Sequence, residues 1–248
     1  MSSPNPAPTS RSASASAFAS VPSPAVAPVH PGIVNNPWFA SLATPDQQAL
    51  LAHAQLLRLQ PGEMLFRQGA APGGFYGLLK GTLKISSLRE DGREAILVLL
   101  EPGNWMGEIS LIDGEPRTHD ATALCAAELL VVPQAAFYAL MESVTFAQAM
   151  TRLLAGRVRS LYGVVEDSAL RSTRTRVAKR LLLLARGDAT QSADTRLSVP
   201  VSQEALAMML GMTRQTVSKE LKFLQAQALV VVRYGRIDIL SATKLQSV

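Results

Sequence analysis

Residues Ser202–Lys222 read SQEALAMMLGMTRQTVSKELK, two short helical patterns separated by a glycine. Ser202 and Thr213 each precede one pattern, and their hydroxyl groups can accept hydrogen bonds from amides of the first helical turn. Gly211 lies at the junction, where it can adopt a positive φ at little steric cost. The stretch therefore predicts a helix-turn-helix, the motif that places its second helix in the major groove of DNA.

The second predicted helix has one buried face and one polar face. Val217, Leu221 and Leu224 recur at spacings of four and three, the pattern of an apolar helix face. The opposite face is rich in Arg, Lys and Gln, which can hydrogen-bond to guanine and adenine. The alternative is an ordinary surface pair of helices with a solvated basic face. The candidate DNA-contacting residues are Ser202, Thr213, Arg214, Gln215, Thr216, Ser218, Lys219 and Lys222.

A β-hairpin, or wing, is predicted directly after the second helix. Leu229–Arg233 and Arg236–Leu240 are strand-like, and Tyr234–Gly235 is the turn between them. Arg233 and Arg236 flank this turn and are candidate phosphate contacts, which would position the protein without reading the base sequence.

The positive charge of the chain lies in the same region. Residues 172–248 hold 12 Lys and Arg against 5 Asp and Glu, a net charge of +7, whereas residues 1–171 have a net charge of −2. Clustered positive charge is what binding to DNA phosphates requires. The length of 248 residues suits two modest domains. No apolar run reaches the roughly 18 residues of a membrane span, so no membrane partner is expected.

The composition of the first residues and the single cysteine indicate where the protein works. Residues 1–31 contain 7 Pro, 8 Ser and 7 Ala, and we expect a disordered tail over residues 1–32. This segment lacks the continuous apolar core of a signal peptide. Cys125 excludes a disulfide framework within the chain and fits a reducing cytoplasm. Because it lies in an apolar run, we interpret it as a buried structural thiol.

Residues 33–141 are predicted to form a β-rich sensor domain. A short helical lead-in, Pro37–Gln55, is followed by short strands separated by Gly and Pro, which is typical of a jelly-roll or a barrel. The predicted strands are Leu56–Leu59, Met64–Phe66, Phe75–Leu79, Thr82–Leu88, Ala95–Leu100, Asp120–Cys125 and Glu128–Val132.

A segment between two of these strands carries the candidate ligand-binding residues. Ile109–Ile112 is predicted to form one helical turn whose amides can bind an anion. Glu108 can accept hydrogen bonds from ribose hydroxyls, and Arg117 can bind a phosphate as a bidentate fork. The alternative is an exposed Glu–Arg pair without a ligand. The candidate residues are Gly107, Glu108, Ile109, Ser110, Arg117 and Thr118.

A long helix is predicted from about Glu142 to Leu170, within a central segment of residues 142–171. Four apolar residues step by four, three and four, which is the seam of a coiled coil. A dimer seam is favoured over packing on the same subunit's sensor. A dimer would bind a pseudo-palindromic operator with half-sites about one DNA turn apart. The seam residues are Leu154, Val158, Leu161 and Val165.

From about Val34 to Leu245 the chain resembles the Crp/Fnr family of bacterial transcription regulators. The resemblance is carried by the signature PGNWMGEISLIDGEPRTHDATA at Pro102–Ala123, the long helix, and the helix-turn-helix with its wing over residues 172–248. It implies an α+β fold with a cyclic-nucleotide-binding β jelly-roll, a central dimerisation helix and a C-terminal winged helix. It also implies a homodimer, double-stranded DNA as partner, and cyclic AMP or another cyclic nucleotide or dinucleotide as ligand.

The resemblance assigns roles to further residues. The cyclic phosphate and ribose would be held by Gly107, Glu108, Arg117 and Thr118, with Arg157 contributed by the long helix. A polar loop, Gly187–Thr195, lies where family members contact RNA polymerase.

Two departures from the family pattern affect specificity. The purine-binding Thr-Ser pair of the family is replaced by Leu161-Tyr162, so the usual adenine contact is lost or replaced. The Arg-Glu-x-x-x-Arg pattern of the recognition helix reads Arg214-Gln215-x-x-x-Lys219. Gln215 stands where the family pattern has Glu, and this replacement removes the carboxylate that usually accepts a hydrogen bond from cytosine N4. An altered operator sequence is therefore expected.

Three alternatives stay open. They are a ligand-independent regulator with a vestigial pocket, a subunit that controls a protein partner, and a haem or gas sensor using His119. The other histidines, His30 and His53, lie in the tail and on a predicted surface helix, so no catalytic or metal-ligating cluster emerges. The chain is therefore expected to be a regulator and not an enzyme, with no metal.

Overall fold

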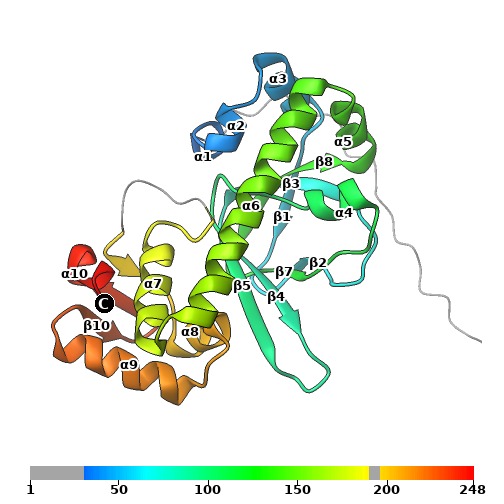
Figure 1. The fold of residues 1–248 in the computed structure, drawn as a ribbon. Helices are drawn as coiled ribbons and strands as arrows, with labels where there is room; N and C mark the ends of the chain where they lie inside the picture. Colours follow the sequence, from blue (N-terminus) through cyan, green and yellow to red (C-terminus); the bar gives the residue numbers. More distant parts are fainter. Residues whose placement is uncertain (1–30, 190–195) are drawn as a thin grey trace, which may run out of the picture.

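The computed structural model describes residues 31–189 and 196–248. The predictions of a tail over residues 1–32 and of a polar loop over Gly187–Thr195 fall mostly outside this range and stay predictions. Figure 1 shows a β-rich body and a smaller, mostly helical body that are joined by one long helix. Within the described residues, no helix is both long enough and apolar enough to cross a membrane.

The sensor domain contains two four-stranded antiparallel sheets, with strand orders β1-β8-β3-β6 and β2-β7-β4-β5. All seven predicted strands are confirmed, with ends shifted by up to two residues, and only the two-residue β6 was not expected. Leu59, Leu78, Leu83 and Ala123 come from both sheets and form one buried cluster. The strands are β1 Gln55–Leu59, β2 Met64–Phe66, β3 Gly74–Lys80, β4 Leu83–Leu88, β5 Glu94–Leu100, β6 Trp105–Met106, β7 Asp120–Ala123 and β8 Ala127–Pro133.

The lead-in Pro37–Gln55 is not one helix. It divides into α2 Pro37–Ala40 and α3 Thr44–Ala52, and Gln55 already belongs to β1. Pro45 explains the division, since it has no amide hydrogen and its ring is tolerated only in the first turn of a helix, so α3 begins there and does not continue from α2. The other sensor helices are α1 Pro31–Val34, α4 Glu108–Asp113 and α5 Gln134–Met141.

An aromatic cluster fixes the lead-in helices to the sheet. The Trp38 ring lies edge-on to Phe75, Trp105 and Phe146, at centroid distances of 5.5, 5.7 and 6.4 Å. Its indole N–H donates to the carbonyl of Ala149 at 3.0 Å, so the buried ring has a hydrogen-bond partner. Trp38 therefore joins α2, the sheet and the long helix.

The long helix is α6, Val144–Leu170, and it begins two residues after the predicted start. Ser143 caps it by accepting from the amide of Phe146. Phe146, Ala149 and Met150 are buried against the sensor. The helix has 27 residues and is about 40 Å long, so its second half extends toward the helical body in Figure 1.

The C-terminal body is the predicted winged helix-turn-helix. Gly211 ends α8 at φ 62°, and Thr213 caps α9. Val217, Leu221 and Leu224 are fully buried, as their spacing predicts. The wing strands pair antiparallel in a three-stranded sheet with order β10-β11-β9. The elements are α7 Thr173–Ala185, β9 Ser198–Val199, α8 Gln203–Leu210, α9 Arg214–Ala226, β10 Val230–Arg233, β11 Arg236–Ile239 and α10 Ala242–Gln246.

A buried ion pair of the helical body is hydrogen-bonded to the sensor sheet. The Asp188 carboxylate accepts from the Arg180 guanidinium at 2.7 Å and from the backbone amide of Leu99, in β5, at 2.8 Å. The Arg180 and Asp188 side chains are only 10% and 5% exposed. Burial raises the pKa of Asp188, and the charge of Arg180 opposes that shift. Beside this interdomain clasp (Leu99, Arg180 and Asp188), the Leu99 side chain packs on the winged-helix core.

Replacing Asp188 by Ala is expected to destabilise the protein by roughly 3 kcal/mol, because the buried Arg180 would lose its counter-charge. Urea unfolding followed by circular dichroism measures this free energy. Asp91→Ala is the control, since Asp91 pairs with Arg93 on an exposed turn and its removal should leave stability unchanged. Equal effects of the two substitutions would contradict a structural role for the clasp.

Candidate functional site

The exposed face of α9 carries the predicted base-reading side chains. Arg214, Gln215, Lys219 and Lys222 are exposed, whereas Thr216 and Ser218 are half-buried. Among the described residues, none of the three cations in this set takes part in an ion pair. They are therefore available to acceptors outside the chain, such as guanine O6 and N7.

Ser202, Thr213 and Thr216 have local hydrogen bonds in this structure. The Ser202 hydroxyl accepts from the amide of Ala205 at 3.0 Å, and the Thr213 hydroxyl accepts from the amide of Thr216 at 3.1 Å. The hydroxyls of Thr213 and Thr216 also lie 2.8 Å apart. These contacts fix the starts of α8 and α9, and a DNA contact by the same residues stays a prediction.

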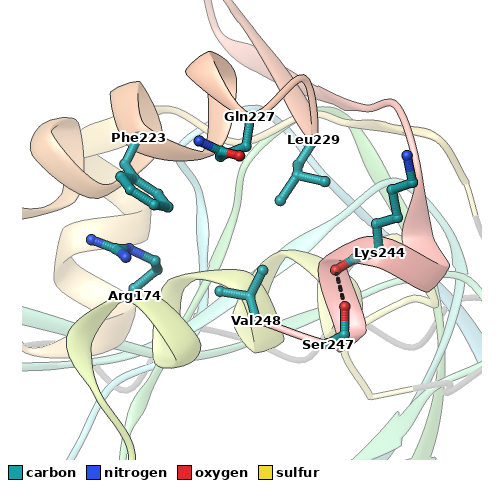
Figure 2. A pocket seen from close by; sticks show the side chains of 7 residues that line it. All are labelled: Arg174, Phe223, Gln227, Leu229, Lys244, Ser247 and Val248. Carbon is teal, nitrogen blue, oxygen red and sulfur yellow. Dashed lines mark hydrogen bonds between the residues drawn. The ribbon is translucent and has the colours of Figure 1, made fainter.

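The side of α9 that faces α7 holds an interaction that sequence reasoning missed. The Arg174 guanidinium lies 3.4 Å from the centroid of the Phe223 ring, and its Nε donates to the Glu220 carboxylate at 2.9 Å. Figure 2 shows Arg174 and Phe223 at one end of an open groove of about 510 Å³. Lys244 lies at its other end, and Val248 lies between them. No sequence signal could find this contact, because Arg174 is 46 residues away from Glu220.

In the sensor domain the structure brings together Glu108 and Arg157. Glu108 begins α4 directly after Gly107, whose φ is 97°, and its side chain is fully buried. Arg157 reaches over from α6, donates through Nη1 to Oε1 of Glu108, and donates through Nη2 to the carbonyl of Trp105 at 2.6 Å. Oε2 of Glu108 has no hydrogen-bond partner among the described residues.

Arg117 is only 3% exposed and its guanidinium points inward. Nη1 donates to the carbonyl of Gly107 at 2.7 Å, and Nη2 donates to the carbonyl of Gly74 at 3.0 Å. The guanidinium carbon lies 4.5 Å from the Phe66 ring centroid and 5.6 Å from that of Tyr76. Burial lowers the pKa of Arg117 and raises the pKa of Tyr76. Nε of Arg117 is buried and has no partner among the described residues.

The remaining candidates near α4 differ in exposure. Ile109 and Thr118 are exposed, while Ser110 is buried and donates to the carbonyl of Pro116 at 3.3 Å. The predicted helical turn at Ile109–Ile112 lies within α4. Burial lowers the pKa of His119, and no group of metal-ligating side chains is found within the described part of the chain.

The interpretation of Cys125 as a buried thiol is wrong. The residue is exposed. Strand β7 ends at Ala123, and the chain bends at Leu124 and Cys125 before β8 begins at Ala127. The predicted strand Asp120–Cys125 was expected to include Cys125, whereas β7 ends two residues earlier and leaves Cys125 in the bend before β8.

The seam residues of α6 are largely uncovered. Val158, Leu161 and Val165 are 48%, 62% and 57% exposed, and Leu154 is half-buried. The alternative that this stripe packs on the sensor of the same chain is therefore wrong for three of its four residues. Tyr162, beside Leu161, is also 71% exposed.

Comparisons with known proteins agree with this arrangement. Residues 56–144 match the family model of the cyclic nucleotide-binding domain, and residues 175–248 match that of the Crp-like helix-turn-helix domain. The chain is 30% identical to the CRP-like cAMP-activated global transcriptional regulator of Mycobacterium tuberculosis, over 70% of this chain and 78% of the relative. It is 28% identical to the cyclic AMP receptor protein of Thermus thermophilus, over 86% of this chain and 96% of the relative.

Solved structures share the fold. FixK2 from Bradyrhizobium japonicum superposes with a TM-score of 0.68 at 21% identity, over 78% of this chain and 96% of that chain. A CRP-family transcriptional regulator from Thermus thermophilus superposes with a TM-score of 0.62 at 25% identity, over 77% and 95%. With both domain models in this order and relatives that are transcription regulators, the chain belongs to the Crp/Fnr family of DNA-binding transcription regulators.

Proposed function

We propose that the chain works as a homodimer whose sensor domain binds a cyclic nucleotide or cyclic dinucleotide and thereby controls binding to a pseudo-palindromic operator. The observation that carries this proposal is the contact between Glu108 and Arg157. It connects a buried sensor carboxylate to the helix that bears the exposed seam. The bacterial cytoplasm, which contains the DNA, is the expected place of action.

The polar atoms of the sensor suit a cyclic phosphodiester with ribose hydroxyls. Oε2 of Glu108 is a buried acceptor without a partner among the described residues, and a ribose hydroxyl could donate to it. Arg117 uses one N–H of each terminal nitrogen on the carbonyls of Gly107 and Gly74, which leaves one N–H on each and the Nε–H. An anion would compete with these carbonyls for the guanidinium.

Ligand binding would act on α6 through Arg157. A ribose hydroxyl on Oε2 of Glu108 would share the carboxylate with Arg157, which donates to Oε1, so ligand binding would alter the contact that attaches α6 to the sensor. Such a ligand shifts the population of dimer arrangements only by its differential affinity for the two states. Leu161 and Tyr162 lie one turn beyond Arg157 and replace the Thr-Ser pair of the family with an aliphatic and a phenolic side chain, which supports a different mode of base recognition.

A ligand-independent regulator is the second candidate. It is favoured by the fact that Arg157 already occupies one oxygen of Glu108, and Arg117 already binds two backbone carbonyls. In that case the sensor would only support the dimer. A contact of the loop Gly187–Thr195 with RNA polymerase is proposed on family resemblance alone.

Titration calorimetry with cyclic AMP, cyclic GMP and cyclic di-GMP tests ligand binding. At least one is expected to bind, and Arg117→Lys should weaken that binding about 10- to 100-fold, because a lysine retains the charge but loses the fork. His53→Gln, at an exposed residue that follows α3 and lies outside the signature, is the control and should bind normally. If none of the three binds at millimolar concentration, the ligand proposal fails and the second candidate stands.

The seam is tested by placing a charge on it. Val165→Glu is expected to give a monomer in analytical ultracentrifugation, because paired helices would bury two like charges. DNA affinity should fall by two orders of magnitude or more, roughly the benefit of linking two binding sites. Ser160→Glu lies about 140° around α6 from Val165 and should remain dimeric. A dimeric Val165→Glu protein would show that the subunits associate elsewhere.

Base reading is tested at Arg214. A duplex selected from a random pool serves as operator, and binding is followed by fluorescence anisotropy. Arg214→Ala should cost on the order of 1–3 kcal/mol on this duplex and much less on a random one. Lys222→Ala, which removes another exposed cation of α9, is measured on the same two duplexes for comparison. Equal losses on both duplexes would instead assign Arg214 to a phosphate.

A further inference from the structure

The wing places two arginines and one carboxylate on the same hairpin. Arg233 and Arg236 are directly opposite each other in the antiparallel pair β10·β11. Asp238 follows Arg236 by two residues, so both side chains lie on the same face of β11. Gly235 completes the tight turn with φ 70°, and Tyr234 beside it is fully exposed.

Asp238 contacts both arginines. Its Oδ2 accepts from Nε of Arg233 at 2.5 Å, and its Oδ1 lies 3.6 Å from Nε of Arg236. The arginine side chains are 55% and 54% exposed, whereas that of Asp238 is 21% exposed. One carboxylate therefore lies between the two cations that the wing would offer to DNA.

The position of Asp238 is fixed from the other side. The Ser198 hydroxyl, in β9, donates to Oδ1 of Asp238 at 2.7 Å, and the two residues are partners in the sheet. The Ser198 hydrogen bond, followed by the contacts with Arg233 and Arg236, lowers the pKa of Asp238. The carboxylate is thus ionised at neutral pH, and the Ser198 hydrogen bond holds it on the wing beside the two arginines.

We propose that Asp238 is a specificity-determining residue that limits the sequence-independent attraction of the wing to DNA phosphates. The inference rests on the proposed function, in which Arg233 and Arg236 contact phosphates. Phosphate contacts supply essentially all of non-specific binding and carry no sequence information. With Asp238 ionised, the net charge of these three side chains is +1 and not +2.

DNA phosphates compete with Asp238 for the two arginines, and this competition explains why the carboxylate weakens specific binding less than non-specific binding. Exposed ion pairs are weak, so a phosphate can take an arginine from Asp238 when it is held in the right place. The recognition helix α9 holds the duplex in that place only when it is seated on a matching sequence. On random DNA the phosphates are not held there, and Asp238 retains the arginines. The carboxylate therefore lowers non-specific affinity more than specific affinity.

The test uses the full chain with Asp238→Asn, which keeps an oxygen acceptor for Ser198 and removes the charge. Binding to the selected duplex and to a random duplex is measured by fluorescence anisotropy at several salt concentrations. On random DNA the plot of log affinity against log salt should become steeper by about 0.9, the slope for one more phosphate contact. This corresponds to about five-fold tighter random binding at 0.15 M salt, with a lower ratio of specific to random affinity.

Glu90→Gln is the matched control. It removes the same charge from an exposed position between β4 and β5 and should leave the slope unchanged. In a chain that also carries Arg233→Ala and Arg236→Ala, the effect of Asp238→Asn should disappear. An increase that persists without the two arginines would overturn the proposal, since general charge would then be its cause.

The remaining outcomes separate this inference from the proposed function. If Asp238→Asn leaves the slope on random DNA unchanged or weakens random binding, while the double arginine variant binds less, the inference fails and the wing's role in DNA binding stands. If the unaltered chain binds no selected duplex better than random DNA, the proposed function itself fails.

Discussion

The contact between the Arg157 guanidinium and the fully buried Glu108 carboxylate determines how the sensor is joined to the rest of the molecule. A buried carboxylate is tolerated only when a cation or several hydrogen bonds compensate for its lost hydration. That compensation comes from α6, the element that also bears the exposed seam. The sensor therefore depends electrostatically on the long helix, and any ligand that takes over Glu108 changes the attachment of that helix.

A second connection runs directly from the sensor sheet to the winged helix. Through the interdomain clasp, the amide of Leu99 in β5 is bound to Asp188, which follows α7. Arg196 adds an exposed contact by donating to Glu101 at 2.6 Å. Since β5 is also one strand of the sheet that contains β7 and β4, that sheet is connected to the winged helix by a route separate from α6. The two connections make the relative position of the bodies depend on the sensor in two ways.

The elements that could be predicted from sequence are those with local causes. The helix-turn-helix follows from two hydroxyl caps, a glycine at positive φ and apolar spacings within 23 residues, Ser202–Leu224. The sensor strands follow from Gly and Pro breaks. Where the local pattern was ambiguous, prediction failed, as at Cys125 in a turn between two apolar strands and at Pro45, which divides the lead-in.

The parts that could not be predicted depend on long-range contacts. The sequence pattern does not reveal that the Gly74 carbonyl accepts from Arg117, because Gly74 lies 43 residues earlier. Leu99 and Asp188 are 89 residues apart, and no periodicity relates them. The position of Arg157 beside Glu108 was reached only through family resemblance, because the two lie on different elements whose packing the sequence pattern does not specify.

Arg174 restricts how the helix α9 can rotate relative to α7. Its guanidinium stacks on the ring of Phe223 while its Nε donates to Glu220. One side chain of α7 therefore contacts two residues of α9 that lie about one helical turn apart. Rolling α9 about its own axis would break both contacts and uncover the aromatic ring. The orientation of the exposed face of α9 is thus set within the winged helix, and in the proposed dimer an adjustment to a different half-site spacing would come from rigid displacement of the whole winged helix.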